Sequence, residues 1–164
     1  MPLYLGIDPG IGITGYGLIE EKRDGALSAV AYGVIETPKT HTLVRRLQTL
    51  RDELRALIAT WSPAEAGIEA IFFATNARTI IPVAQARGVA LLTLADAGLA
   101  IGEYTPLQVK QAVSGYGQAD KRQMQEMTRL LLQLPGLPKP DDAADALAVA
   151  ITHIHSRRLT RLQG

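Results

Sequence analysis

An apolar run near the start of the chain, residues 3–7, ends in a single carboxylate, Asp8, and a glycine-rich turn follows it. A run this apolar predicts a buried central strand. A buried charge is costly unless a partner or a metal meets it, and no cationic residue stands close to Asp8 in the sequence. The rest of the chain must therefore bring a partner to this carboxylate.

The bulk composition limits the class of protein. With 164 residues, of which 47% are apolar, we expect one globular domain over residues 1–164. The absence of cysteine leaves only oxygen or imidazole ligands for a metal. The first residues predict a core strand and no signal peptide, and no apolar stretch is long enough to span a membrane, so we expect a cytoplasmic protein. The net charge of +1 neither indicates nor excludes a nucleic-acid partner, because clustered carboxylates can cancel basic residues.

The periodicity predicts three strands, then a helix, a strand, a helix, a strand and further helices. The first three strands form an antiparallel meander, and the fourth, which follows a helix, is expected to lie parallel to the first. The fold class is therefore α/β, with a mixed five-stranded sheet flanked by helices. The predicted strands cover residues 3–8, 13–20, 27–35, 65–73 and 99–104, and the helices cover 42–60, 79–96, 121–132 and 141–158, with another beginning at 105–106.

Carboxylates fall at the end of the first strand, within the fourth strand and at the start of the last helix. Glu69 interrupts an apolar strand, and a buried glutamate is rare without a role. Asp142 and Asp145 are three residues apart and share a helix face. If the first and fourth strands are neighbours, these residues meet Asp8. Four such carboxylates stay ionised only around hard cations, and two Mg²⁺ ions about 4 Å apart, suited to phosphodiester hydrolysis, fit the set.

Structural alternatives exist for some of these residues. Asp8 could bond the amides of the following turn, at Gly10 or Gly12. Asp142 could cap the last helix, a role that Asp145, one turn further on, fits poorly.

Two other residue pairs are candidates for the site. Phe72 and the next aromatic point to opposite faces of a strand, so Phe72 is either a core residue or a ring for base stacking. His153 and His155 are two apart on a helix and face different ways, which argues against a histidine metal pair.

Six segments together resemble the RuvC family of Holliday junction resolvases, which has a ribonuclease H-like fold. The resemblance covers residues 3–155. It implies a homodimer that resolves four-way junction DNA in recombination and repair by paired symmetric nicks, with Mg²⁺ (or Mn²⁺) and the RuvA–RuvB branch-migration complex as partner. The segments are Leu5-Gly6-Ile7-Asp8-Pro9-Gly10, Thr14-Gly15-Tyr16-Gly17, Ile68-Glu69-Ala70-Ile71-Phe72, Gln85-Ala86-Arg87-Gly88-Val89-Ala90, Gln108-Val109-Lys110-Gln111 and Asp142-Ala143-Ala144-Asp145-Ala146-Leu147-Ala148.

The resemblance also implies roles for single residues. Two departures stand out: Asp141 is an extra acidic neighbour, able to cap the helix or alter metal preference, and Thr75 replaces a frequent basic residue. The helix over residues 79–96 is the expected dimer interface. The implied catalytic and metal-binding residues are Asp8, Glu69, Asp142 and Asp145, and the DNA contacts are Phe72, Lys110 and Lys121, with Arg78 and Arg87 as further phosphate-contact candidates.

Three other functions share parts of this pattern. A catalytically inactive junction-binding module would not need all four carboxylates. A single-site ribonuclease H-type enzyme would act on RNA–DNA hybrids, and cleavage of a hybrid compared with a four-way junction separates the two. The turn after Asp8 also resembles the phosphate loop of actin-like ATPases, but those need two lobes and a much longer chain than 164 residues.

Overall fold

A five-stranded mixed sheet forms the centre of the computed structural model, which describes residues 1–70 and 77–164. The strand order is β3-β2-β1-β4-β5. β1 and β2 pair antiparallel, as do β2 and β3, whereas β4 is parallel to β1 and β5 is parallel to β4. This topology confirms the predicted sheet. The strands are β1 (Leu3–Asp8), β2 (Ile13–Glu21), β3 (Leu27–Glu36), β4 (Glu65–Glu69) and β5 (Ala100–Tyr104).

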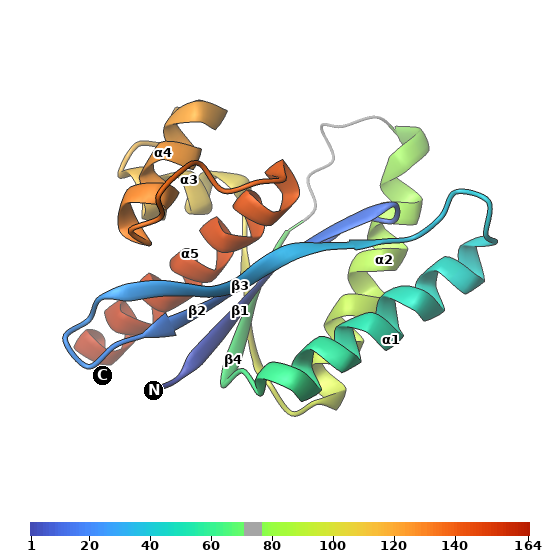
Figure 1. Ribbon diagram of the computed structural model, residues 1–164, viewed down its shortest axis with the longest axis horizontal. Helices are drawn as coiled ribbons and strands as arrows, with labels where there is room; N and C mark the ends of the chain where they lie inside the picture. The colour runs from blue at the N-terminus through green and yellow to red at the C-terminus, as the bar shows by residue number, and fades with distance from the viewer. Residues whose placement is uncertain (71–76) are drawn as a thin grey trace.

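Helices cover both faces of this sheet (Figure 1). One face packs against α1 (Leu43–Trp61) and α2 (Ala77–Asp96), and the other against α5 (Asp141–Gln163), flanked by α3 (Pro106–Ser114) and α4 (Lys121–Leu131). Successive side chains of β1 point to opposite faces of the sheet. Tyr4 packs in the core under α5, and Leu5 packs in the core under α1 and α2. A strand buried on both faces needs such a continuous apolar run.

Glycines on the sheet allow α5 to lie unusually close to it. Gly6 and Gly17 are paired across β1 and β2, and Gly15 is paired with Asp8. A Cβ at Gly6 would overlap the Ala146 carbonyl oxygen, and one at Gly15 would overlap the carbonyl oxygen of Asp142. Side chains at these positions would therefore push the helix away from the end of β1.

The element boundaries differ from the predictions mainly at the ends. Thr42 caps α1, and Thr105 caps α3 in a reciprocal pair with Gln108; the start of α3 at residues 105–106 is the one that the sequence predicted. α5 continues to Gln163 instead of ending near residue 158, because no glycine or proline interrupts it before Gly164. β4 is described to Glu69, so the predicted extension over residues 71–73 lies outside the described residues. Across residues 1–70 and 77–164, no helix has the length and apolar character needed to cross a bilayer.

Candidate active site

The parallel pairing of β1 and β4 brings Asp8 and Glu69 to the same edge of the sheet. Ile7 pairs with Ile68, so the next residue of each strand lies at the shared carboxyl end. Both side chains are half-buried, and the two carboxyl groups lie close enough to perturb each other's pKa. The predicted meeting of these two residues is therefore found in the structure.

The start of α5 brings two more carboxylates to this edge. Asp8, Asp142 and Asp145 each offer a carboxylate oxygen, and these three oxygens lie within 4.8 Å of one another. All three side chains are half-buried. Glu69 lies beside Asp8 but is not among the residues whose oxygens all come within 4.8 Å of one another; we call the four residues together the acidic cluster: Asp8, Glu69, Asp142 and Asp145.

The alternative roles proposed for these aspartates are not the ones the structure shows. Pro140, in an extended conformation, occupies the N-cap of α5, and no side chain caps that helix, so neither Asp141 nor Asp142 is the cap. In the turn after β1, the Gly10 amide donates to the hydroxyl of Thr14 and not to Asp8. The Thr14 hydroxyl donates in return to the Gly10 carbonyl oxygen, which closes the turn without the carboxylate.

Burial and mutual repulsion make the acidic cluster costly when no cation is bound. Burial, then the charges of Glu69 and Asp145, raise the pKa of Asp8 from its ordinary value of 3.8 to about 9. Burial also raises the pKa of Glu69, and that of Asp145 against the opposing effect of Lys121. A bound divalent cation would lower these pKa values, because it stabilises the ionised form of every ligand. The donor set, carboxylate oxygens alone, is the kind that Mg²⁺ and Mn²⁺ prefer.

Lys121 lies beside the acidic cluster at the start of α4. Its ammonium group is 2.7 Å from the carboxylate of Asp141, which also accepts a hydrogen bond from Gln125. This contact, with further attraction from Asp145 and Asp142, raises the pKa of Lys121. Asp141 is thus turned toward α4, and the side chains of the pair are each 60% exposed. Lys110 lies on the neighbouring α3 and is half-buried.

The remaining predicted DNA contacts are placed differently. Arg78 lies exposed in the first turn of α2. Arg87, on the same helix, donates from Nε to the main-chain oxygen of Glu69 at 3.1 Å and forms an ion pair with Glu103. Phe72 and Thr75 lie outside the described residues. Sequence reasoning missed the link between Arg87 and Glu69, for which no local pattern gives a signal.

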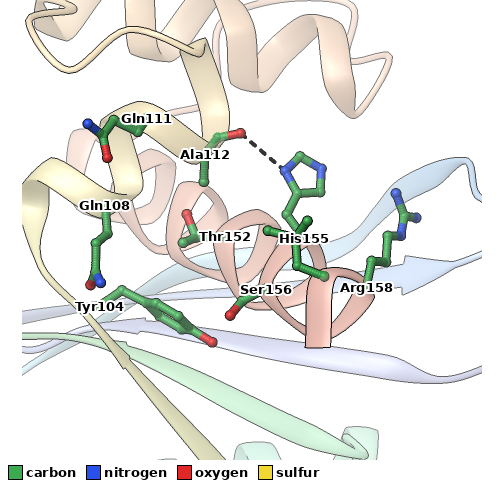
Figure 2. Close-up of a pocket in the computed structure, with 9 residues that line it drawn as sticks. Tyr104, Gln108, Gln111, Ala112, Thr152, His155, Ser156 and Arg158 are labelled. Atoms are coloured by element: carbon green, nitrogen blue, oxygen red, sulfur yellow. Dashed lines mark hydrogen bonds between the residues drawn. The ribbon is translucent and has the colours of Figure 1, made fainter. Parts of the chain in front are cut away.

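The two histidines of α5 take no part in the acidic cluster. His153 bridges the Glu65 carboxylate, at 2.6 Å, and the Tyr104 hydroxyl, at 2.7 Å. His155 donates from Nδ1 to the carbonyl oxygen of Ala112 beside a cavity of about 570 Å³ (Figure 2). The two rings thus face different elements, β4 and β5 for His153 and α3 for His155, as the sequence predicted. None of the four carboxylates lines that cavity, which lies between α3 and the later turns of α5.

One family of known proteins matches this chain over most of its length. The sequence profile described as "Crossover junction endodeoxyribonuclease RuvC" matches residues 4–153. The chain belongs to the RuvC family. A RuvC relative from Roseiflexus sp. strain RS-1, also named a crossover junction endodeoxyribonuclease, is 55% identical over 157 residues, which cover 96% of this chain and 93% of the relative.

Solved structures agree with this assignment. Thermus thermophilus RuvC in complex with Holliday junction substrate superposes with a TM-score of 0.91 and 30% identity, over 98% of this chain and 97% of that one. The yeast mitochondrial Holliday junction resolvase, at 14% identity, has a TM-score of 0.70 over 96% of this chain and 80% of its own, which shows a shared fold alone. The expected ribonuclease H-like α/β architecture is therefore that of the RuvC family.

Proposed function

We propose that this chain is a crossover junction endodeoxyribonuclease that resolves four-way Holliday junctions in recombination and DNA repair. The observation that carries the proposal is the acidic cluster, formed at one sheet edge by residues from β1, β4 and α5 in a chain of the RuvC family. The names of the RuvC relatives and the junction-bound Thermus structure support the substrate. The whole chain, residues 1–164, serves as one nuclease domain in this proposal.

The acidic cluster would hold the metal. Asp8 lies beside Glu69 and within 4.8 Å of oxygens of Asp142 and Asp145, and these four residues would hold two Mg²⁺ ions, with Mn²⁺ as a substitute. When bound, such a pair of cations supplies charge stabilisation for both the attacking and the leaving oxygen of a phosphodiester. The chain's own contribution is to hold four oxygen ligands on rigid elements and to keep basic side chains from neutralising them.

Basic side chains near the acidic cluster would hold the DNA backbone. Lys121, and Lys110 on the adjacent helix, are placed to contact phosphates, which fixes the position of the strand without reading its sequence. Base stacking by Phe72, and phosphate contacts from Arg78 and Arg87, remain predictions from the resemblance.

Paired nicks on two symmetric strands require two active sites. We therefore propose a homodimer, with α2 as the expected interface and action alongside the RuvA–RuvB branch-migration complex. Each site would cut an ordinary phosphodiester, so selectivity for the junction would come from the geometry of the dimer.

Cleavage of an end-labelled mobile four-way junction with Mg²⁺ or Mn²⁺ tests this function. Paired symmetric nicks should form with the wild type and disappear with Asp8→Asn at unchanged junction affinity. Junction binding without cleavage in either metal would leave the inactive binding module. Cleavage of an RNA–DNA hybrid in preference to the junction would leave the ribonuclease H-type enzyme.

A further inference from the structure

The peptide group that joins Glu69 to Ala70 is held at both of its ends. Its N–H, on Ala70, donates to the main-chain oxygen of Tyr104 in β5 at 2.7 Å. Its carbonyl oxygen, on Glu69, accepts from Nε of Arg87 at 3.1 Å. These bonds come at the point where β4 ends, one residue beyond its last pair with β1, Ile7 with Ile68.

Arg87 is built into the protein and is not a free surface cation. It lies on α2 next to Ala86, which is fully buried against the sheet, and its own side chain is only 16% exposed. Glu103, on β5 opposite Ile68, pairs with the guanidinium group and neutralises it. A charge this desolvated needs such a partner. The planar guanidinium thus spans one carbonyl oxygen and one carboxylate, a geometry that a lysine cannot reproduce.

The orientation of this peptide decides where the Glu69 side chain points. Its plane sets the backbone angle ψ of Glu69, and hence the direction of the Cα–Cβ bond toward Asp8. Without Arg87, the carbonyl oxygen would lose its partner at the very end of the strand, and the carboxyl group of Glu69 would no longer be held in one place. Metal affinity depends strongly on such supporting contacts.

We infer that Arg87 is a positioning residue for Glu69, acting through the main chain, and that it is not a contact for DNA phosphate. The inference rests on the proposed function, because Glu69 matters to the reaction as a metal ligand. Arg87, paired with Glu103, would thus fix the position of Glu69 through the main-chain carbonyl group and not through the carboxyl group.

Titration of the DNA-free protein with Mn²⁺ alone, by calorimetry, measures the effect directly. Arg87→Gln should weaken Mn²⁺ affinity by about 10- to 100-fold, the range for loss of a contact that supports a metal ligand. Arg87→Lys keeps the charge but lacks the planar fork, so it should recover only part of that loss. Arg55→Gln removes an exposed arginine from α1 and serves as the matched control, with unchanged Mn²⁺ affinity.

Junction binding in metal-free buffer separates this role from a phosphate contact. A positioning role leaves the junction affinity of Arg87→Gln, and its dependence on salt, equal to those of the wild type. The inference is overturned if Arg87→Gln binds Mn²⁺ normally but binds the junction more weakly, with a salt slope reduced by about 1, since that is the signature of a lost phosphate contact.

A second variant tests the same role in case Arg87→Gln does not fold. Glu103→Gln changes a side chain that is 56% exposed and leaves the guanidinium group in place without the negative charge that neutralises it. It should lower Mn²⁺ affinity by less than Arg87→Gln does, and normal affinity in both Glu103→Gln and Arg87→Lys would refute the inference. If the wild type binds Mn²⁺ no better than Asp8→Asn does, it is the proposed function that fails.

Discussion

Replacing Asp8 by asparagine should stabilise the metal-free protein at neutral pH while it abolishes cleavage. In the folded chain, burial and the neighbouring Glu69 and Asp145 raise the pKa of Asp8 to about 9, so this carboxyl group holds a proton at pH 7. In the unfolded chain the same group is ionised. Folding must therefore take up a proton, at a free-energy cost that asparagine, which resembles the neutral acid, does not incur.

The size of the effect follows from the pKa values. Each unit corresponds to about 1.4 kcal/mol, so the gap between the ordinary pKa of 3.8 and pH 7 sets an upper bound of about 4 kcal/mol. Partial solvent access and relaxation of the neighbouring carboxylates lower this to roughly 2–4 kcal/mol, which is roughly 5–15 °C in Tm for a domain of this size. Because the folded-state pKa is raised, the wild type loses stability as pH rises from about 4 to about 9, and the advantage of asparagine grows over the same range.

Thermal unfolding in EDTA at acidic, neutral and alkaline pH measures the difference. The control is Asp52→Asn, which removes an exposed carboxylate of α1 and should change stability by less than about 0.5 kcal/mol. Added Mg²⁺ should stabilise the wild type and narrow the gap, because under the proposed function the cation would bind tightly only to the intact acidic cluster. The reasoning is refuted if Asp8→Asn melts at or below the wild type at neutral pH without metal, or if the gap does not change with pH.

Three further changes test other parts of the structure. Gly15→Ala should displace the start of α5 and reduce cleavage by about 10²-fold, whereas Gly136→Ala, where a Cβ meets nothing within 4 Å, should leave cleavage unchanged. His153→Ala should cost about 2–4 kcal/mol of unfolding free energy by chemical denaturation. Although burial raises the pKa of Glu65, bonds to His153 and a neighbouring arginine lower it overall, so this contribution is present above the ordinary pKa of 4.5 and is lost as pH falls below it. Lys121→Gln should weaken junction binding and reduce its salt slope by about 1, measured by titration at several salt concentrations.

Local pattern was enough to predict most of the fold. The apolar runs around Asp8 and Glu69 predicted buried strands, and the helix between them predicted a parallel crossover, so their meeting at one edge followed from topology. The Thr-Pro pair at residues 105–106 predicted the start of α3, because it supplies both a cap and a first helical residue. The predicted end of α5 was wrong by five residues, because arginines in its last turns look like a helix end but are compatible with continued helix.

The contacts that position the acidic cluster could not be predicted in the same way. The approach of α5 depends on which face of the sheet Gly15 and Gly17 occupy, and this is fixed only once the β1–β2 register is known. The bond from Arg87 to the Glu69 carbonyl joins residues 18 positions apart through tertiary packing. The pairing of Lys121 with Asp141 likewise depends on how α4 lies against α5.

Two basic side chains beside the acidic cluster are paired with carboxylates outside it. Arg87 pairs with Glu103 and reaches only the main chain of Glu69, and Lys121 pairs with Asp141. If either cation bonded a carboxylate of the cluster directly, it would lower that group's pKa and stabilise the metal-free protein, but it would also compete with a divalent ion for the same oxygens. Among the described residues, the ion pairs of Arg87 and Lys121 go to Glu103 and Asp141 and not to the four carboxylates of the cluster. Glu103 and Asp141 therefore keep positive charge near the acidic cluster without letting it occupy the carboxylates that would hold the proposed metal.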